Sequence, residues 1–246
     1  MKSLLLSFLL GMMIFGAVAA QAAGPLMALD EVKIDVTDQA SLQRGARLFV
    51  NYCMGCHSAE YMRYARVGRD LGLTENQLLA SMIFTTDDEG ELVNPGSLMT
   101  NAMTAAYGDE AFGKAPPDLT LLTRVRSEDW LYTFLRSFYL DDSRPLGVNN
   151  RLFENVGMPH PLWELQGWQE KRVDTNGHVR LQVVEPGSMS GPEYDRAIRD
   201  IVTFLSYMAE PMQMERQKIG LYVLLFLVAF VGLAYLLKKE YWKDVH

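Results

Sequence analysis

Two long apolar runs lie at the ends of the chain, and a body of mixed polar and apolar positions lies between them. The first run follows Lys2 and reaches about Ala20, whereas the second, Ile219–Leu237, contains no charged residue. In several segments of the body, residues 23–218, apolar residues recur three and four positions apart, which is the spacing of one helix face. The pattern predicts two apolar ends that flank one globular body.

The N-terminal run has the parts of a secretory signal peptide. A basic start at Lys2 precedes a short apolar core, and the small residues Ala20-Gln21-Ala22 supply an A-x-A cleavage pattern. We expect residues 1–22 to be removed on export. An uncleaved anchor helix is the alternative interpretation.

The C-terminal run has the length of a membrane span. At about 1.5 Å per residue it covers about 28 Å, close to the roughly 30 Å hydrocarbon core of a bilayer. Lys238 and Lys239 follow it directly, which agrees with the positive-inside bias of membrane proteins. The pattern predicts a transmembrane anchor at 219–237, a short inside tail at 238–246, and the body on the outside.

Helical periodicity dominates the body. Helices are predicted at 38–52, 74–84, 127–140 and 190–209. A small β-hairpin is predicted around Asn176-Gly177, whereas 85–125 is rich in turn residues and 141–170 is predicted as loop. The predicted fold class is mainly α, with long loops of the kind that wrap a bound group.

Composition and charge narrow the function classes. The chain has 246 residues, 49% of them hydrophobic, so it is too apolar for a disordered protein. Two cysteines are too few for a disulfide scaffold. The net charge of −7, with no basic stripe, argues against a nucleic-acid partner.

Both cysteines fall in one motif, Cys53-Met54-Gly55-Cys56-His57. This C-x-x-C-H spacing is the attachment sequence for c-type haem, because two thioethers reach both vinyl groups of one porphyrin while the histidine is presented to the iron. A redox disulfide, a zinc site and a structural disulfide are the alternatives. A single motif predicts one covalently attached haem c, with His57 as an iron ligand.

The second axial ligand is less clearly marked. Met158 lies in Asn155-Val156-Gly157-Met158-Pro159, where glycine permits a close approach of the backbone and proline fixes it. A methionine paired with a histidine raises the reduction potential of a haem. Four other residues remain open as rivals: Met99, Met103, His160 and Met189.

Two polar features suit a haem pocket without establishing one. Arg124 and Arg126 follow Pro116-Pro117 and are candidate partners of the haem propionates, although ordinary solvated arginines are the alternative. The acidic cluster at 87–91 would attract a basic partner, but a solvated loop is the favoured interpretation.

Taken in order, these motifs resemble the cytochrome c1 family of bacteria over nearly the whole chain. The residues that carry the resemblance are Cys53-x-x-Cys56-His57, Ala115-Pro116-Pro117-Asp118-Leu119 with Arg124 and Arg126, Gly157-Met158-Pro159, Thr203-Phe204-Leu205 and Ala209-Glu210-Pro211. The family is the haem-c subunit of the respiratory cytochrome bc1 complex. The resemblance therefore implies a c-type cytochrome fold, with helices and long loops around the haem.

The resemblance also implies roles for individual residues. Thioether links would form at Cys53 and Cys56, and the iron would be held by His57 and Met158. Contact with the propionates is implied for Arg126 and less firmly for Arg124, and Pro117 joins the candidate cofactor-binding residues. His160 departs from the family pattern after the methionine and leaves ligand exchange open.

The implied function is electron relay without bond chemistry of its own. A Rieske iron–sulfur protein would reduce the haem, the haem would reduce a cytochrome c, and the anchor would pack beside cytochrome b. The complex is a dimer in the bacterial inner membrane, with the haem domain in the periplasm. Two other functions stay open: a stand-alone membrane-tethered cytochrome c that feeds a terminal oxidase, and a haem sensor with a weak sixth ligand.

Overall fold

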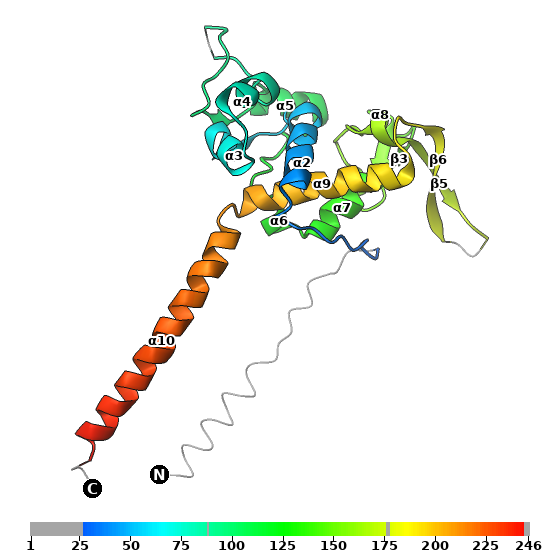
Figure 1. Ribbon diagram of the computed structural model, residues 1–246. Helices are drawn as coiled ribbons and strands as arrows, with labels where there is room; N and C mark the ends of the chain where they lie inside the picture. The colour runs from blue at the N-terminus through cyan, green and yellow to red at the C-terminus, as the bar shows by residue number, and fades with distance from the viewer. Residues whose placement is uncertain (1–26, 88, 176–177, 244–246) are drawn as a thin grey trace.

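The computed structural model describes residues 27–87, 89–175 and 178–243. These residues form a mainly helical domain from which one long helix departs (Figure 1). The helices are α2 (Gln39–Tyr52), α3 (Tyr64–Asp70), α4 (Glu75–Ser81), α5 (Ala105–Phe112), α6 (Leu122–Val125), α7 (Glu128–Arg136), α8 (Trp163–Gln166), α9 (Gly191–Ala209) and α10 (Gln213–Tyr241). The strands are β1 (Ala59–Arg63), β2 (Leu98–Met99), β3 (Phe138–Leu140), β4 (Val148–Asn150), β5 (Gly167–Val173) and β6 (Val179–Pro186).

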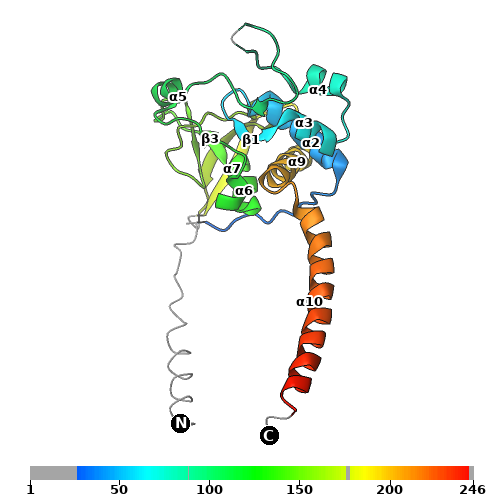
Figure 2. The ribbon, with the colours of Figure 1, turned by 90° about the vertical axis from the view of Figure 1, so that its left-hand side faces the viewer.

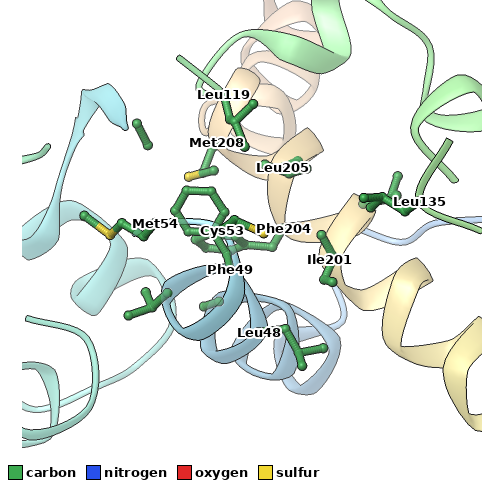
Figure 3. Packing of buried hydrophobic residues seen from close by; sticks show 14 of the residues in the cluster. Leu48, Phe49, Cys53, Met54, Leu119, Leu135, Ile201, Phe204, Leu205 and Met208 are labelled. Carbon is green, nitrogen blue, oxygen red and sulfur yellow. The ribbon is translucent and has the colours of Figure 1, made fainter. Parts of the chain in front are cut away.

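The core forms where α2 crosses α9. Each helix begins at a capping residue: the Asp38 side chain accepts a hydrogen bond from Ser41 N, and Ser190 forms a capping box with Glu193. The apolar faces meet at Phe49 and Phe204, whose ring centroids lie 5.6 Å apart (Figure 3). This crossing fixes the end of α2, which is where the cysteine motif begins.

A glycine allows the two helices to approach closely. A Cβ atom at Gly45 would overlap the carbonyl oxygen of Asp200 and lie 2.8 Å from Cβ of Phe204. The same crossing is joined by Ser41 and Arg44, which both bond the carboxylate of the buried Asp200 at 2.6 Å. Backbone contact and a buried carboxylate therefore set the register of α2 on α9.

We expect Gly45→Ala to lower the free energy of unfolding by about 1–3 kcal/mol, because the added methyl group has to push two packed helices apart. Chemical denaturation of the purified full chain in detergent measures the change. Gly191→Ala is the matched control, since its added Cβ meets nothing within 4 Å. Equal stabilities of the two variants would contradict the close-approach role of Gly45.

The mainly α fold class is confirmed, and the small hairpin is longer than the sequence indicates. Strands β5 and β6 pair antiparallel, from Gly167 opposite Pro186 to Val173 opposite Val179, and the ribbon extends from the side of the domain (Figure 1). Two more antiparallel pairs, β1–β2 and β3–β4, are short.

Several boundaries differ from the predicted ones. The helix predicted at 127–140 ends at Arg136, after which the chain turns into β3. The segment 141–170 is not all loop, because it contains β4, α8 and the start of β5. The turn-rich segment 85–125 contains β2, α5 and α6 in addition to its turns.

The C-terminal helix leaves the domain (Figure 2), and none of the residues in its most apolar window is buried. Within the described residues, Glu215–Tyr241 is the one helix long and apolar enough to cross a membrane. Helix α10 begins at Gln213, before the apolar run at 219–237, and ends after it at Tyr241. The predicted signal peptide, at 1–22, lies outside the described residues.

Polar contacts tie the domain to the start of this helix. Glu210, between α9 and α10, forms ion pairs with Arg124 at 2.8 Å and Arg216 at 2.7 Å. One turn earlier, the Tyr207 hydroxyl donates to Asp70 at 2.7 Å. Burial alone would raise the pKa of Asp70, but hydrogen bonds from Arg66 and Tyr207 and the charge of Arg66 lower it below its ordinary value.

We expect Tyr207→Phe to cost about 1–2 kcal/mol of unfolding free energy at pH 7, because a hydrogen bond to an ionised carboxylate is lost. A lowered pKa of Asp70 in the fold means that this stabilisation is present above the ordinary aspartate pKa and is lost as the pH falls through the lowered value. Denaturation at pH 7 and pH 3 measures both effects, with the exposed Tyr61→Phe as control. If Tyr207→Phe lowered the free energy of unfolding by the same amount at both pH values, this role of Asp70 would be contradicted.

Candidate haem-attachment site

The cysteine motif forms a tight turn at the end of α2. Cys53 follows the helix and still donates its N–H to Phe49 O, while the N–H groups of Cys56 and His57 both bond Cys53 O, at 3.1 and 2.9 Å. Cys53 and His57 are each only 8% exposed, and Cys56 is half-buried. Figure 3 shows Cys53 beside Phe49 and Phe204 at the α2–α9 crossing. The fold thus places all three motif side chains within one turn at the edge of the core.

Neither cysteine has the environment of an activated thiolate. Both thiols are free. Burial, and to a smaller extent the charge of the neighbouring Cys56, raises the pKa of Cys53 to about 12. Burial also raises the pKa of Cys56. Redox-active C-x-x-C cysteines have lowered pKa values instead. This environment argues against a pair of thiols that exchange disulfides.

The imidazole of His57 is held in one tautomer. Its Nδ1 lies 2.8 Å from the carbonyl oxygen of Pro117. Burial lowers the pKa of His57, against the opposing effects of this hydrogen bond and of Asp118, so the ring is neutral at pH 7. A carbonyl oxygen only accepts, so the proton is on Nδ1 and the lone pair of Nε2 is available to a metal.

The carbonyl that orients His57 is itself fixed by the strand after the motif. Leu119 N donates to Ser58 O at 2.9 Å, and Glu60 N donates to the Asp118 carboxylate at 2.7 Å. Asp118 also accepts from Thr120 N at 2.8 Å, which closes its own turn. Neither Ser58 nor Asp118 was given a role from the sequence, although Asp118 belongs to the motif at 115–119 that carries the family resemblance.

Met158 lies in a braced loop beside the core. Its side chain is half-buried and packs against core residues. A Cβ atom at Gly157 would lie 2.5 Å from Phe112 O, so the expected close approach is present. Asn155, at φ 61°, donates its N–H to the Asn149 side chain and accepts from Arg144 at 3.1 Å. This bracing suits a segment that has to hold a ligand in place.

The rival ligands have other surroundings. Met99 is fully buried in β2 opposite Ala59. Met189 is half-buried, and its N–H donates to Leu165 O, whereas Met103 is half-buried in a loop. His160, two residues after Met158, is buried. In the described ranges, no cluster of three or more His, Cys, Asp or Glu side chains is placed to hold a metal ion, as a zinc site would require.

The two arginines have protein partners in this structure. Arg124 pairs with Glu210 at the base of the domain, and Arg126 lies 4.9 Å from the ring centroid of Trp130. Their contact with haem propionates stays a prediction.

In the acidic cluster at 87–91, the Asp87 side chain accepts hydrogen bonds from the N–H groups of Glu89 and Glu91, which makes an exposed loop closed by its own turn. A steering role for this loop also stays a prediction.

Comparisons with known proteins find similar chains over nearly the whole length of this one. The Cytochrome C1 family model matches residues 31–245. A cytochrome c1 of Allochromatium vinosum is 51% identical, with 100% of this chain and 99% of the relative aligned. A Nitrosomonas europaea protein named ammonia monooxygenase gamma subunit is 43% identical over 98% of this chain and 99% of its own length. The mitochondrial cytochrome c1 haem protein of Neurospora crassa is 29% identical over 83% of this chain and 62% of the relative.

The donor set and the comparisons lead to the same conclusion. Two free cysteines next to a neutral histidine with an available Nε2 fit the c-type haem that this family implies. The long apolar helix at Glu215–Tyr241 fits a membrane-anchored subunit. The chain belongs to the cytochrome c1 family.

Proposed function

We propose that this chain is the haem-c subunit of a cytochrome bc1 complex. It would accept electrons one at a time from the Rieske iron–sulfur protein and pass them to a cytochrome c. The observation that carries the proposal is the Cys53–Cys56–His57 turn, with His57 oriented by the carbonyl of Pro117 at 2.8 Å. The names of the Allochromatium and Neurospora relatives support the same function.

Each residue of the site has a defined task in this proposal. Cys53 and Cys56 would hold the porphyrin covalently, and His57 Nε2 and the Met158 sulfur would bind the iron. A bound haem c supplies one-electron exchange between the ferrous and ferric states. The Pro117 carbonyl increases the donor strength of His57, and the braced Met158 loop keeps the second ligand in place. Arg126, and less firmly Arg124, would contact the propionates.

The proposed topology has one membrane pass. Residues 1–22 would be removed as a signal peptide, and residues 23–218 would form the haem domain in the periplasm. The anchor at 219–237 would cross the bacterial inner membrane beside cytochrome b, and the tail at 238–246 would lie in the cytoplasm. The apolar side chains of α10 are exposed along its length, which suits contact with lipid and a neighbouring membrane subunit.

Purification in mild detergent tests the assembly. We expect the chain to co-isolate, in a complex with two copies of each subunit, with a b-type haem protein and an iron–sulfur protein, and ubiquinol to reduce its haem. Isolation as a lone haem protein would favour the stand-alone cytochrome, which the comparisons do not favour. Co-isolation with a monooxygenase would instead favour the function in the name of the Nitrosomonas relative.

A further inference from the structure

The side chain of His160 is enclosed by two aromatic rings. It is 4% exposed, and its ring stacks on Phe138 with centroids 4.9 Å apart and planes 6° apart. Trp168 meets the same ring edge-on, at 6.0 Å and 75°. We call Phe138 and Trp168 the aromatic box. A ring held on two sides in this way has little freedom to turn.

Polar atoms inside this enclosure require partners. Among the described residues, both ring nitrogens of His160 and Oε1 of Gln166 are buried without a direct hydrogen bond. The side chain of Gln166 interacts with the ring of His160. A neutral imidazole has one N–H donor, and an amide oxygen is an acceptor. Buried polar groups in native proteins nearly always pair, so the two side chains complement each other.

The box belongs to a rigid platform. Phe138 lies in β3, Gln166 in α8 and Trp168 in β5, and Gln169 Nε2 donates to Phe138 O at 2.9 Å and to Arg136 O at 3.0 Å. Gln166 Nε2 donates to Arg136 O at 3.3 Å. The platform therefore fixes both the rings and the amide that surround His160.

His160 connects this platform to the loop that carries the proposed second iron ligand. Only Pro159, whose ring restricts the backbone, separates His160 from Met158. A displacement of the imidazole would therefore be transmitted to the methionine through a stiff link of one residue. Ligation by His160 itself would require its ring to leave the box and break the contacts with Phe138 and Trp168.

We propose that His160 is a positioning residue that holds Met158 on the iron, by ring stacking in the aromatic box and, in the haem-loaded chain, by a hydrogen bond that its ring N–H would donate to Oε1 of Gln166. The inference rests on the proposed function, in which Met158 is the second ligand. The position that departs from the family pattern would thus be an anchor for the ligand loop and not an exchange ligand.

The test uses the full haem-loaded chain in detergent. The readouts are the methionine–iron charge-transfer band of the oxidised protein, the reduction potential, and the fraction of reduced haem that binds carbon monoxide. We expect His160→Phe, which keeps an aromatic ring, and Gln166→Leu each to raise the carbon monoxide-binding fraction about tenfold, or about 1.4 kcal/mol. The double variant should show no more than either single change, because both remove one interaction. His178→Phe, at a 72% exposed side chain, is the matched control and should match the parent chain.

The outcomes separate this inference from the proposed function. If Met158→Leu leaves the band and potential unchanged, the proposed ligand set is wrong. If Met158→Leu abolishes the band but His160→Phe and Gln166→Leu behave like His178→Phe, only the positioning role is wrong. If Met158→Leu keeps a six-coordinate haem that His160→Phe destroys, His160 is itself a ligand and the inference is overturned. If His160→Phe does not accumulate as a haem protein, the same measurements on Gln166→Leu decide whether the positioning role holds.

Discussion

Replacement of both Cys53 and Cys56 by alanine is expected to abolish covalent haem attachment. Haem staining of a denaturing gel should fall to background, because no thiol remains in the chain to form a thioether. Single replacements should keep one thioether and so retain a stained band with a shifted visible spectrum. The loss should extend to electron transfer, since ligation by His57 and Met158 without covalent links lets the cofactor dissociate.

Met54→Leu is the matched control for this prediction. Met54 lies between the cysteines and is buried, so leucine at this position tests the effect of disturbing the motif while preserving side-chain volume. We expect full haem staining in this variant. A double cysteine variant that still carries haem on a denaturing gel would show that attachment occurs elsewhere.

Helices were predictable from the sequence where they are long enough to repeat an apolar face. Helices α2 and α9 cover several turns, and their caps at Asp38 and Ser190 mark their starts within one residue. Helix α3, with 7 residues, and α8, with 4, offer too few turns for a periodic pattern, and neither has the capping box that marks α4, which also has 7 residues. The polar first turns of α10 are helical because they continue a long helix. The hydrophobicity pattern of the sequence could not predict these turns.

The chemistry of the site was predictable only where it is local in sequence. The C-x-x-C-H motif lies within five consecutive residues, so the sequence pattern alone was sufficient to predict a haem-attachment site. The orientation of His57 depends on the backbone carbonyl of Pro117, sixty residues away. Because every residue has a backbone carbonyl, the residue type at position 117 does not reveal this role. The enclosure of His160 joins Phe138 and Trp168 from different strands, so it exists only after β3 and β5 have packed.

The second large effect concerns the proposed sixth ligand, Met158. Met158→Leu preserves side-chain volume, so the half-buried loop should remain packed and folded. Loss of the thioether sulfur should remove the methionine–iron charge-transfer band and open the reduced haem to carbon monoxide. The reduction potential should fall by a sizeable part of the range of about 0.8 V that axial ligands span. A redox titration of the haem-loaded chain measures this fall.

Met189→Leu is the matched control, because Met189 is also half-buried against the core and was a rival ligand. Its spectrum and potential should equal those of the parent chain. The opposite pattern, with the change in Met189→Leu and none in Met158→Leu, would transfer the ligand to Met189. In the assembled complex, the lowered potential of Met158→Leu should also slow reduction of the haem by the Rieske protein, because the driving force for that step decreases. Ubiquinol-dependent reduction of added cytochrome c should therefore decrease in Met158→Leu and stay unchanged in Met189→Leu.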